Sequence, residues 1–213
     1  MTQQEIQPFT LDEARAFLAA AASHRLNARW VVGLSLGLRQ GEALGLQWSD
    51  VNLDTGVLHV QRSLRRQPNG SLALAPPKTT RSERSLPMPE PLVAALQAHF
   101  EQQKSERAAL VESWEDQNFV FTTAVGTPIH PRNDYRAFQA LLQRAQLRKV
   151  RLHDLRHTAA SLLLAQGVPS RVVMEILGHS QISVTLNTYS HVDTTLTQEA
   201  AARMKEALWP GDE

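Results

Sequence analysis

The chain has 213 residues, of which 42% are hydrophobic and 20% are charged, and its formal net charge is +1. This length supplies one good core but is short for two ordinary domains. The chain has no cysteine, which excludes disulfides, thiolate catalysis and the common cysteine-containing zinc sites. It also has no apolar run of about eighteen residues and no apolar signal segment at its start. We therefore expect no membrane partner and a cytoplasmic protein.

The distribution of charge says more than the net charge. Basic residues gather in "RRQPNG", "KTTRSER" and "RKVRLHDLRH", whereas acidic residues gather between positions 90 and 116 and at the C-terminus. A basic face on a neutral protein would attract phosphate groups. Scattered, solvated charge is an equally good interpretation of the composition by itself.

The first part of the chain has the pattern of helices. Thr10 followed by Glu13 is a capping-box signature, and it precedes apolar residues at helical spacing. A second helix is expected over residues 27–36 and a short third helix over residues 41–46. After these the hydrophobic period changes from helical spacing to alternation.

The alternating region predicts strands. Residues 56–64 alternate in strand fashion, and Asn69-Gly70 is a strong hairpin signal before a second strand at 71–78. Residues 84–89 form a short third strand, expected at an edge because of its prolines. We predict a small three-stranded antiparallel sheet within a mainly helical, α+β domain.

Helices then resume to the end of the chain. The apolar spacing predicts them over 91 to about 111, 133–147, 153–167, 169–178 and about 194–208. Glycines 167 and 178 are suited to end two of these helices. No internal repeat or low-complexity linker is present, so residues 1–213 are predicted to form a single domain.

Several polar residues have ordinary interpretations when each is taken alone. Arg39 can be a solvated arginine at a helix end, Lys78 a surface lysine, and Tyr189 a half-buried ring. His179 follows a helix end and can simply interact with the helix dipole. None of these four residues identifies a site without the others.

The stretch "RLHDLRH" is harder to explain as a set of ordinary surface residues. His153 and Arg156 are three residues apart, and so lie on one face at the start of a helix. Free N–H groups at a helix N-terminus suit an anion. His157 lies four residues from His153 and raises a zinc interpretation, but the pattern lacks the glutamate of His-Glu-x-x-His.

Together these residue types suit phosphodiester chemistry. Two arginines can hold the non-bridging oxygens of a phosphate bidentately. A lysine can protonate a departing alkoxide, and a tyrosine can attack phosphorus and hold the cut strand as an ester. Because guanidinium groups can spread the charge of the transition state, this chemistry needs no metal ion and no cofactor.

Four sequence boxes carry a resemblance to a known family. They are "GLRQGEALGLQWSDV", "PPKTTRSERSLPMP", "LHDLRHTAASLLLAQG" and "LGHSQISVTLNTYSHV". In this order and at these gaps they resemble the catalytic domain of tyrosine recombinases, the phage integrase family. The resemblance covers residues from about 9 to 192 and implies an integrase-like catalytic core that breaks and rejoins DNA.

The resemblance implies a role for each matching residue. Arg39 and Arg156 would clamp the phosphate. Tyr189 would be the nucleophile that forms a 3′-phosphotyrosyl bond, and Lys78 would be the general acid for the leaving 5′-oxygen. These four residues would carry cleavage and its reversal.

The same resemblance assigns three supporting residues. His153 would act as a general acid or base near the tyrosine, and His179 would donate a hydrogen bond to the phosphate. Glu42 takes the acidic position after the first arginine and would orient the basic groups. His157 is given no chemical role, and a structural one is expected.

The resemblance also implies an assembly. The family exchanges strands between two duplexes through a Holliday junction in a homotetramer on paired DNA sites. We expect a monomer or weak oligomer without DNA, acting at the nucleoid of a bacterium or phage host. The helix at about 194–208 would dock on a neighbouring subunit or fold back on its own core. The N-terminal core-binding domain of the family is expected to be absent from this chain.

Three other hypotheses remain beside this one. The chain could be an inactive module that keeps the fold and binds DNA without cutting it. It could be a metal-dependent nuclease that uses His153, His157 and a carboxylate, in which case a chelator would abolish activity. A type IB topoisomerase would share the tyrosine chemistry without sequence recognition or a tetramer, but the compact "HDLRH" and "LGHS" boxes look more like integrases.

Overall fold

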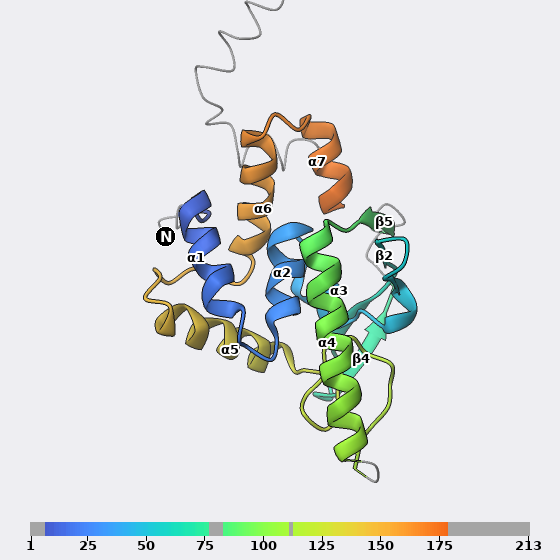
Figure 1. Cartoon of the computed structure of the whole chain (residues 1–213). Helices are drawn as coiled ribbons and strands as arrows, with labels where there is room; N and C mark the ends of the chain where they lie inside the picture. Colours follow the sequence, from blue (N-terminus) through green and yellow to red (C-terminus); the bar gives the residue numbers. More distant parts are fainter. Residues whose placement is uncertain (1–6, 77–82, 111–112, 179–213) are drawn as a thin grey trace, which may run out of the picture.

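The computed structural model describes residues 7–76, 83–110 and 113–178 (Figure 1). Helices make up about half of this part of the chain, and short strands make up a much smaller share of it. The predicted α+β fold, mainly helical with a small antiparallel sheet, is confirmed. None of the helices in these ranges is both long enough and apolar enough to cross a lipid bilayer.

The helices begin and end close to the predicted positions. Their bounds are α1 Leu11–Ala21, α2 Asn27–Ser35, α3 Gln40–Leu44, α4 Glu90–Ala109, α5 Pro131–Arg144, α6 Asp154–Ala165 and α7 Ser170–Leu177. The capping box at the start of α1 is present: Thr10 Oγ1 accepts from the Glu13 N–H, and the Glu13 carboxylate accepts from the Thr10 N–H. Gly178 ends α7 in the left-handed conformation, with φ of 66°.

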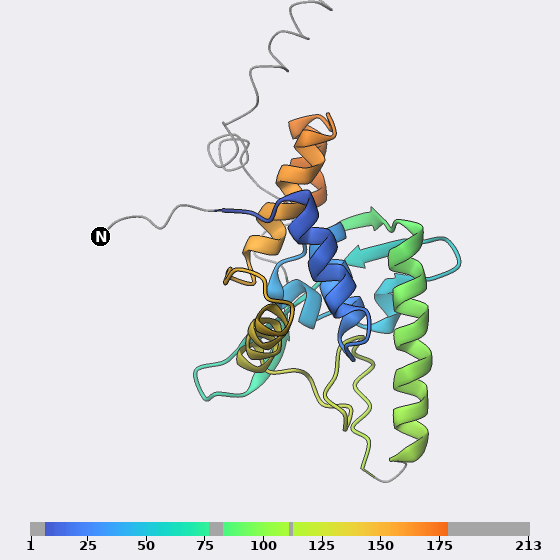
Figure 2. The ribbon, with the colours of Figure 1, turned by 60° about the vertical axis from the view of Figure 1, so that its left-hand side comes forward.

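The helices pack around α2. This helix contacts α1, α4 and α6, while α7 packs against α6 and strand β5 (Arg84–Pro87) (Figure 1). An aromatic cluster fills the centre, where the Phe17 ring lies 5.6 Å from the Phe138 ring and 6.4 Å from the Trp30 ring. Figure 2 shows α4 running along one side of the molecule, opposite α5. The core therefore joins elements from both ends of the described chain.

The strands divide into two sheets. Strands β1 (Val51–Asn52), β2 (Val57–Val60) and β5 (Arg84–Pro87) form a three-stranded antiparallel sheet in the order β1-β2-β5. Strands β3 (Ser63–Arg66) and β4 (Leu72–Ala75) form a separate antiparallel pair. The third predicted strand does lie at a sheet edge, as β5.

The membership of the three-stranded sheet differs from the prediction. The segment expected as one strand over 56–64 breaks between β2 and β3, so the hairpin strand β4 pairs outside the main sheet and β1 takes a place in it. At the break Arg62 turns to donate to Gln47 and pairs with the buried carboxylate of Asp50 at 3.2 Å. The alternation is interrupted at the residue that makes these two contacts.

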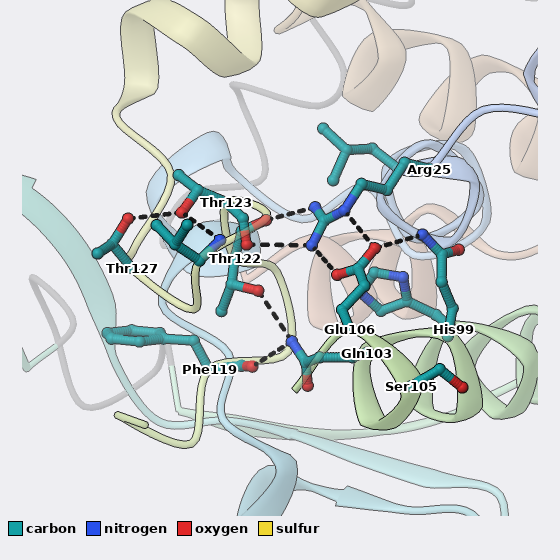
Figure 3. Close-up of polar contacts among 12 residues, drawn as sticks. Arg25, His99, Gln103, Ser105, Glu106, Phe119, Thr122, Thr123 and Thr127 are labelled. Atoms are coloured by element: carbon teal, nitrogen blue, oxygen red, sulfur yellow. Dashed lines mark hydrogen bonds and ion pairs between the residues drawn. The ribbon is translucent and has the colours of Figure 1, made fainter. Parts of the chain in front are cut away.

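A polar network connects α4 to the loop before α2 (Figure 3). Arg25 donates to both carboxylate oxygens of Glu106, at 2.8 and 2.6 Å, and to the carbonyls of Thr122 and Thr123. Gln103 donates to the Thr122 hydroxyl at 3.0 Å. Through the bidentate pair with Glu106 and the two carbonyl bonds, Arg25 fixes the segment after α4 against the helices.

Candidate functional site

Three arginines from separate elements meet at the end of α7. Each donates a hydrogen bond to one of the last carbonyls of that helix. The bonds run from Arg84 Nε to Ile176 O (2.7 Å), from Arg156 Nη2 to Leu177 O (2.6 Å) and from Arg39 Nη2 to Gly178 O (3.1 Å). Carbonyls at a helix C-terminus lack intrahelical partners and carry partial negative charge, so they suit cationic donors. The three guanidinium groups therefore place positive charge around residues 176–178, which directly precede His179 in the sequence.

Arg39 sits where the chain enters α3. Its backbone N–H donates to Glu42 Oε2 at 3.0 Å, and its Nη1 donates to Glu42 Oε1 at 2.6 Å. The Arg39 side chain is 39% exposed. A guanidinium has five N–H donors, so the two bonds to Glu42 and Gly178 leave donors that can hold an anion arriving from solvent.

Glu42 is the shared partner of two arginines. Its side chain is buried, and Oε2 also accepts from Arg84 Nη2 at 3.0 Å. Burial by itself raises the pKa of Glu42, but the guanidinium groups of Arg84 and Arg39 outweigh it and hold that pKa below its ordinary value. Glu42 is therefore an ionised carboxylate at neutral pH, and it orients both arginines.

Arg156 lies in the first turn of α6 and is buried. Its Nη1 donates to Gly37 O at 2.7 Å, and its Nη2 donates to Leu177 O at 2.6 Å. Gly37 lies two residues before Arg39, and Leu177 precedes the glycine whose carbonyl Arg39 binds. The structure thus brings the two arginines of the predicted phosphate clamp to adjacent peptide groups.

His153 is the residue before α6, and its ring lies 5.0 Å from the His157 ring in an edge-on arrangement. Although His153 keeps an exposed surface, desolvation lowers its pKa to about 4, and the nearby His157 and Arg156 act in the same direction. Its imidazole is therefore neutral near pH 7 and can accept a proton. Desolvation also lowers the pKa of His157.

The metal interpretation of His153 and His157 finds no further support in the described ranges. No third histidine or carboxylate there completes a group that could hold a metal ion. The Asp154 carboxylate instead accepts from Arg151, with Nη2 to Oδ1 at 2.9 Å.

Three predicted site residues lie outside the described residues: Lys78, His179 and Tyr189. The same holds for the helix expected at about 194–208. In sequence, Lys78 falls between β4 and β5, and His179 directly follows Gly178. Their roles stay predictions, while Arg39, Glu42, His153 and Arg156 are placed around the end of α7 and the start of α6.

Arg84 also belongs to this cluster, although it is not among the site residues predicted from the sequence. The signal was the alternation of β5, in which Leu86 is buried while Ser85 and Pro87 are exposed. By period two, Arg84 shares the inward face with Leu86. A charged residue on an inward face needs a partner, and Glu42 is that partner.

The segment before Arg39 packs closely on α7 at Gly37, and a substitution there tests this packing. Its φ is 59°, and a Cβ atom added there would lie 2.5 Å from Leu177 Cδ2. We expect Gly37→Ala to lower the free energy of unfolding by roughly 2–4 kcal/mol, as backbone strain and overpacking add. Urea denaturation measures this loss.

Gly167→Ala is the matched control for that substitution. Gly167 has a φ of 77° but no heavy atom within 4 Å of an added Cβ, so only the backbone cost of about 1–2 kcal/mol applies. Equal losses in the two variants would contradict close packing of α7 on the segment before Arg39.

Comparison with known proteins identifies relatives along nearly the whole chain. The model of the phage integrase family matches residues 7–195. A tyrosine recombinase XerC-like protein of Caldanaerobacter subterraneus subsp. tengcongensis is 34% identical over 201 residues, covering 89% of this chain and 51% of the relative. An integrase of Streptomyces ambofaciens is 33% identical over 207 residues, covering 92% and 52%. The chain spans about half the length of these relatives.

Solved structures share the fold. The Tn1549 transposon integrase in complex with a circular intermediate DNA superposes with a TM-score of 0.83 at 23% identity, over 95% of this chain and 67% of that one. The catalytic domain of bacteriophage HP1 integrase superposes with a TM-score of 0.61 at 22% identity, over 96% and 98%.

Proposed function

Because this chain belongs to the phage integrase family, we propose that it is the catalytic domain of a site-specific recombinase. It cleaves DNA strands through a 3′-phosphotyrosyl intermediate and rejoins them. The observation that carries the proposal is the convergence of Arg39 and Arg156 on neighbouring carbonyls at the end of α7. Two fixed guanidinium groups can supply the positive charge that a phosphoryl transition state needs.

The proposed cleavage step uses the neutral His153. The Tyr189 oxygen attacks the scissile phosphorus and gives up its proton to His153, whose lowered pKa leaves it unprotonated at neutral pH. The bond from phosphorus to the 5′-oxygen breaks, and Lys78 supplies the proton to that oxygen. Arg39, Arg156 and His179 hold the non-bridging oxygens.

Rejoining is the reverse of this step. A 5′-hydroxyl attacks the phosphotyrosyl ester, and Tyr189 leaves as the phenol. Because the ester conserves the energy of the phosphodiester, no nucleotide cofactor is required. The arginines carry the charge that a metal ion would otherwise neutralise.

The partner in this proposal is double-stranded DNA with a recombination site. The Tn1549 integrase, which shares the fold, was solved with DNA. The assembly that exchanges strands is a homotetramer on paired sites, with the helix at about 194–208 docking in cis or in trans.

A metal-free covalent assay tests the proposal. The protein, expressed at the full length that its gene encodes, is incubated with supercoiled plasmid that includes the sequence beside the gene, in EDTA, and denatured with detergent. We expect relaxed plasmid and a covalent protein–DNA adduct in the wild type, and neither in Tyr189→Phe.

The other outcomes separate the alternative functions. DNA binding without any adduct would favour the inactive module. Activity that EDTA abolishes, and that Tyr189→Phe retains, would favour a metal-dependent nuclease. Relaxation of any plasmid, with or without the flanking sequence, would favour a topoisomerase.

A further inference from the structure

Arg84 lies at the first position of β5, outside the residues to which a chemical role has been assigned. Its side chain is only 7% exposed. It donates from Nε to Ile176 O at 2.7 Å and from Nη2 to Glu42 Oε2 at 3.0 Å. A Cβ atom on Gly178 would lie 2.8 Å from its Nη1. One buried guanidinium thus touches the last turn of α7 and the carboxylate that holds Arg39.

Glu42 transmits this contact to Arg39. Its Oε1 accepts a hydrogen bond from Arg39 Nη1, while its Oε2 accepts hydrogen bonds from both Arg84 Nη2 and the Arg39 backbone N–H. The carboxylate is therefore held on two sides, and its plane sets the direction of the Arg39 guanidinium. Charge-assisted, multidentate bonds of this kind fix geometry as well as adding energy.

Arg84 also supports the second bond of Arg39. Arg39 Nη2 donates to Gly178 O, and Arg84 packs directly against Gly178 while holding the carbonyl of Ile176. Loss of Arg84 would leave Glu42 buried with one cationic partner and the end of α7 with one donor fewer. Arg84 thus contacts both groups that bind the Arg39 guanidinium, the Glu42 carboxylate and the segment that ends α7.

We propose that Arg84 is a positioning residue for the phosphoryl transfer, acting through Glu42 and the end of α7 to aim Arg39 at the scissile phosphate. This inference rests on the proposed function. A positioning role differs from a purely structural role because its effect on the rate depends on the negative charge of the scissile phosphate. A neutral linkage needs a well-aimed guanidinium far less than an anionic one.

The test compares two DNA substrates. One duplex carries the target site found in the plasmid assay with an ordinary scissile phosphate, and the other carries a methylphosphonate, which lacks one charged oxygen. We expect Arg84→Gln to slow adduct formation about 10–100-fold on the phosphate. On the methylphosphonate the variant should come within about threefold of the wild type. DNA affinity, measured by fluorescence anisotropy, should not change.

Arg25→Gln is the matched structural control. Arg25 is also a bidentate partner of a glutamate and a donor to two carbonyls, but in the network of Figure 3, whose partners are Glu106 in α4 and Thr122 and Thr123 in the segment after it. Any loss of rate that it causes should be the same on both linkages. Arg84→Lys, which keeps the charge but cannot bridge Glu42 and Ile176, should behave like Arg84→Gln.

A double substitution tests the route through Glu42. If Arg84 acts in part through this carboxylate, Arg84→Gln should slow the Glu42→Gln protein by clearly less than it slows the wild type, rather than showing the product of both losses. Independent losses would overturn the route.

The remaining outcomes overturn one claim or both. A wild-type rate for Arg84→Gln, or an equal loss on both linkages as in Arg25→Gln, would overturn the positioning role and leave the proposed function standing. A wild-type protein that forms no adduct on either linkage would overturn the proposed function, and this inference with it.

Discussion

Replacing Arg156 by lysine should slow covalent attachment to DNA by about 10³-fold, the loss expected when a fixed donor to a developing oxyanion is removed. The Arg156 guanidinium spans two backbone carbonyls, Gly37 O and Leu177 O, from the start of α6. A lysine ammonium is a point charge and cannot bridge both in one plane. Single-turnover adduct formation, followed on gels at saturating protein, measures the rate.

Arg151→Lys is the control for this substitution. Arg151 lies just before the same helix but is 54% exposed and pairs with Asp154 at 2.9 Å, so its replacement should change the rate less than about threefold. Thermal unfolding separates damage to the fold from damage to the site, because a buried carbonyl left without its donor costs about 1–3 kcal/mol. A rate near wild type in a folded Arg156→Lys protein would contradict the proposed role of Arg156 in holding the scissile phosphate.

Much of the helical framework could be predicted from local patterns. The Thr10–Glu13 capping box, the glycine stop at Gly178 and the helix that begins at "HDLRH" depend on residues within one or two turns. Local signals of this kind are independent of the rest of the fold. The order of the sequence boxes was also enough to nominate Arg39 and Arg156 as one site.

The pairing of strands could not be predicted in the same way. Strand β2 pairs with β5, so that Leu58 pairs with Leu86, while β3 and β4 of the intervening hairpin pair with each other in a separate sheet of the described residues. Alternation shows which residues face inward but not which strand lies alongside. The ion pair from Arg62 to Asp50 lies where the predicted strand over 56–64 breaks, and it is likewise a contact made by tertiary structure.

The arginine cluster illustrates the same limit at the site. Arg84, Arg156 and Arg39 come from a strand, a helix and a loop, and they meet only because α7 ends between them. All three lie in the sequence boxes that carry the family resemblance, but that resemblance assigns a role only to Arg39 and Arg156 and gives no reason to join Arg84 to them. The role of Glu42 as a common partner follows from its burial between Arg39 and Arg84, which the sequence does not show.

A second polar contact hidden from the sequence supports the start of α3. Asp134, in the first turn of α5, would ordinarily be an exposed acid near a helix N-terminus. In the structure it is fully buried, and its Oδ2 accepts from Arg29 Nη2 and from Gln40 Nε2, each at 3.0 Å. Gln40 follows Arg39 directly, so this network fixes the chain that presents Arg39.

Asp134→Ala should therefore lower the free energy of unfolding by about 3–5 kcal/mol, because it leaves the buried Arg29 guanidinium without its counter-charge. Arg29 is 1% exposed, so solvent cannot compensate for the lost partner. Urea denaturation with linear extrapolation measures the change. The loss should exceed that of any exposed ion pair in the described chain.

Two further variants decide whether the buried charge is the cause. Asp116→Ala breaks the pair with Arg107, in which the Asp116 side chain is 47% exposed, and should cost less than about 1 kcal/mol. Arg29→Met added to Asp134→Ala removes the unpaired cation, and should restore part of the lost stability instead of adding to the loss. If the double variant were less stable than Asp134→Ala by the full cost of a second core substitution, the two side chains would contribute through packing alone, and the charge pair would not be what holds α2, α3 and α5 together.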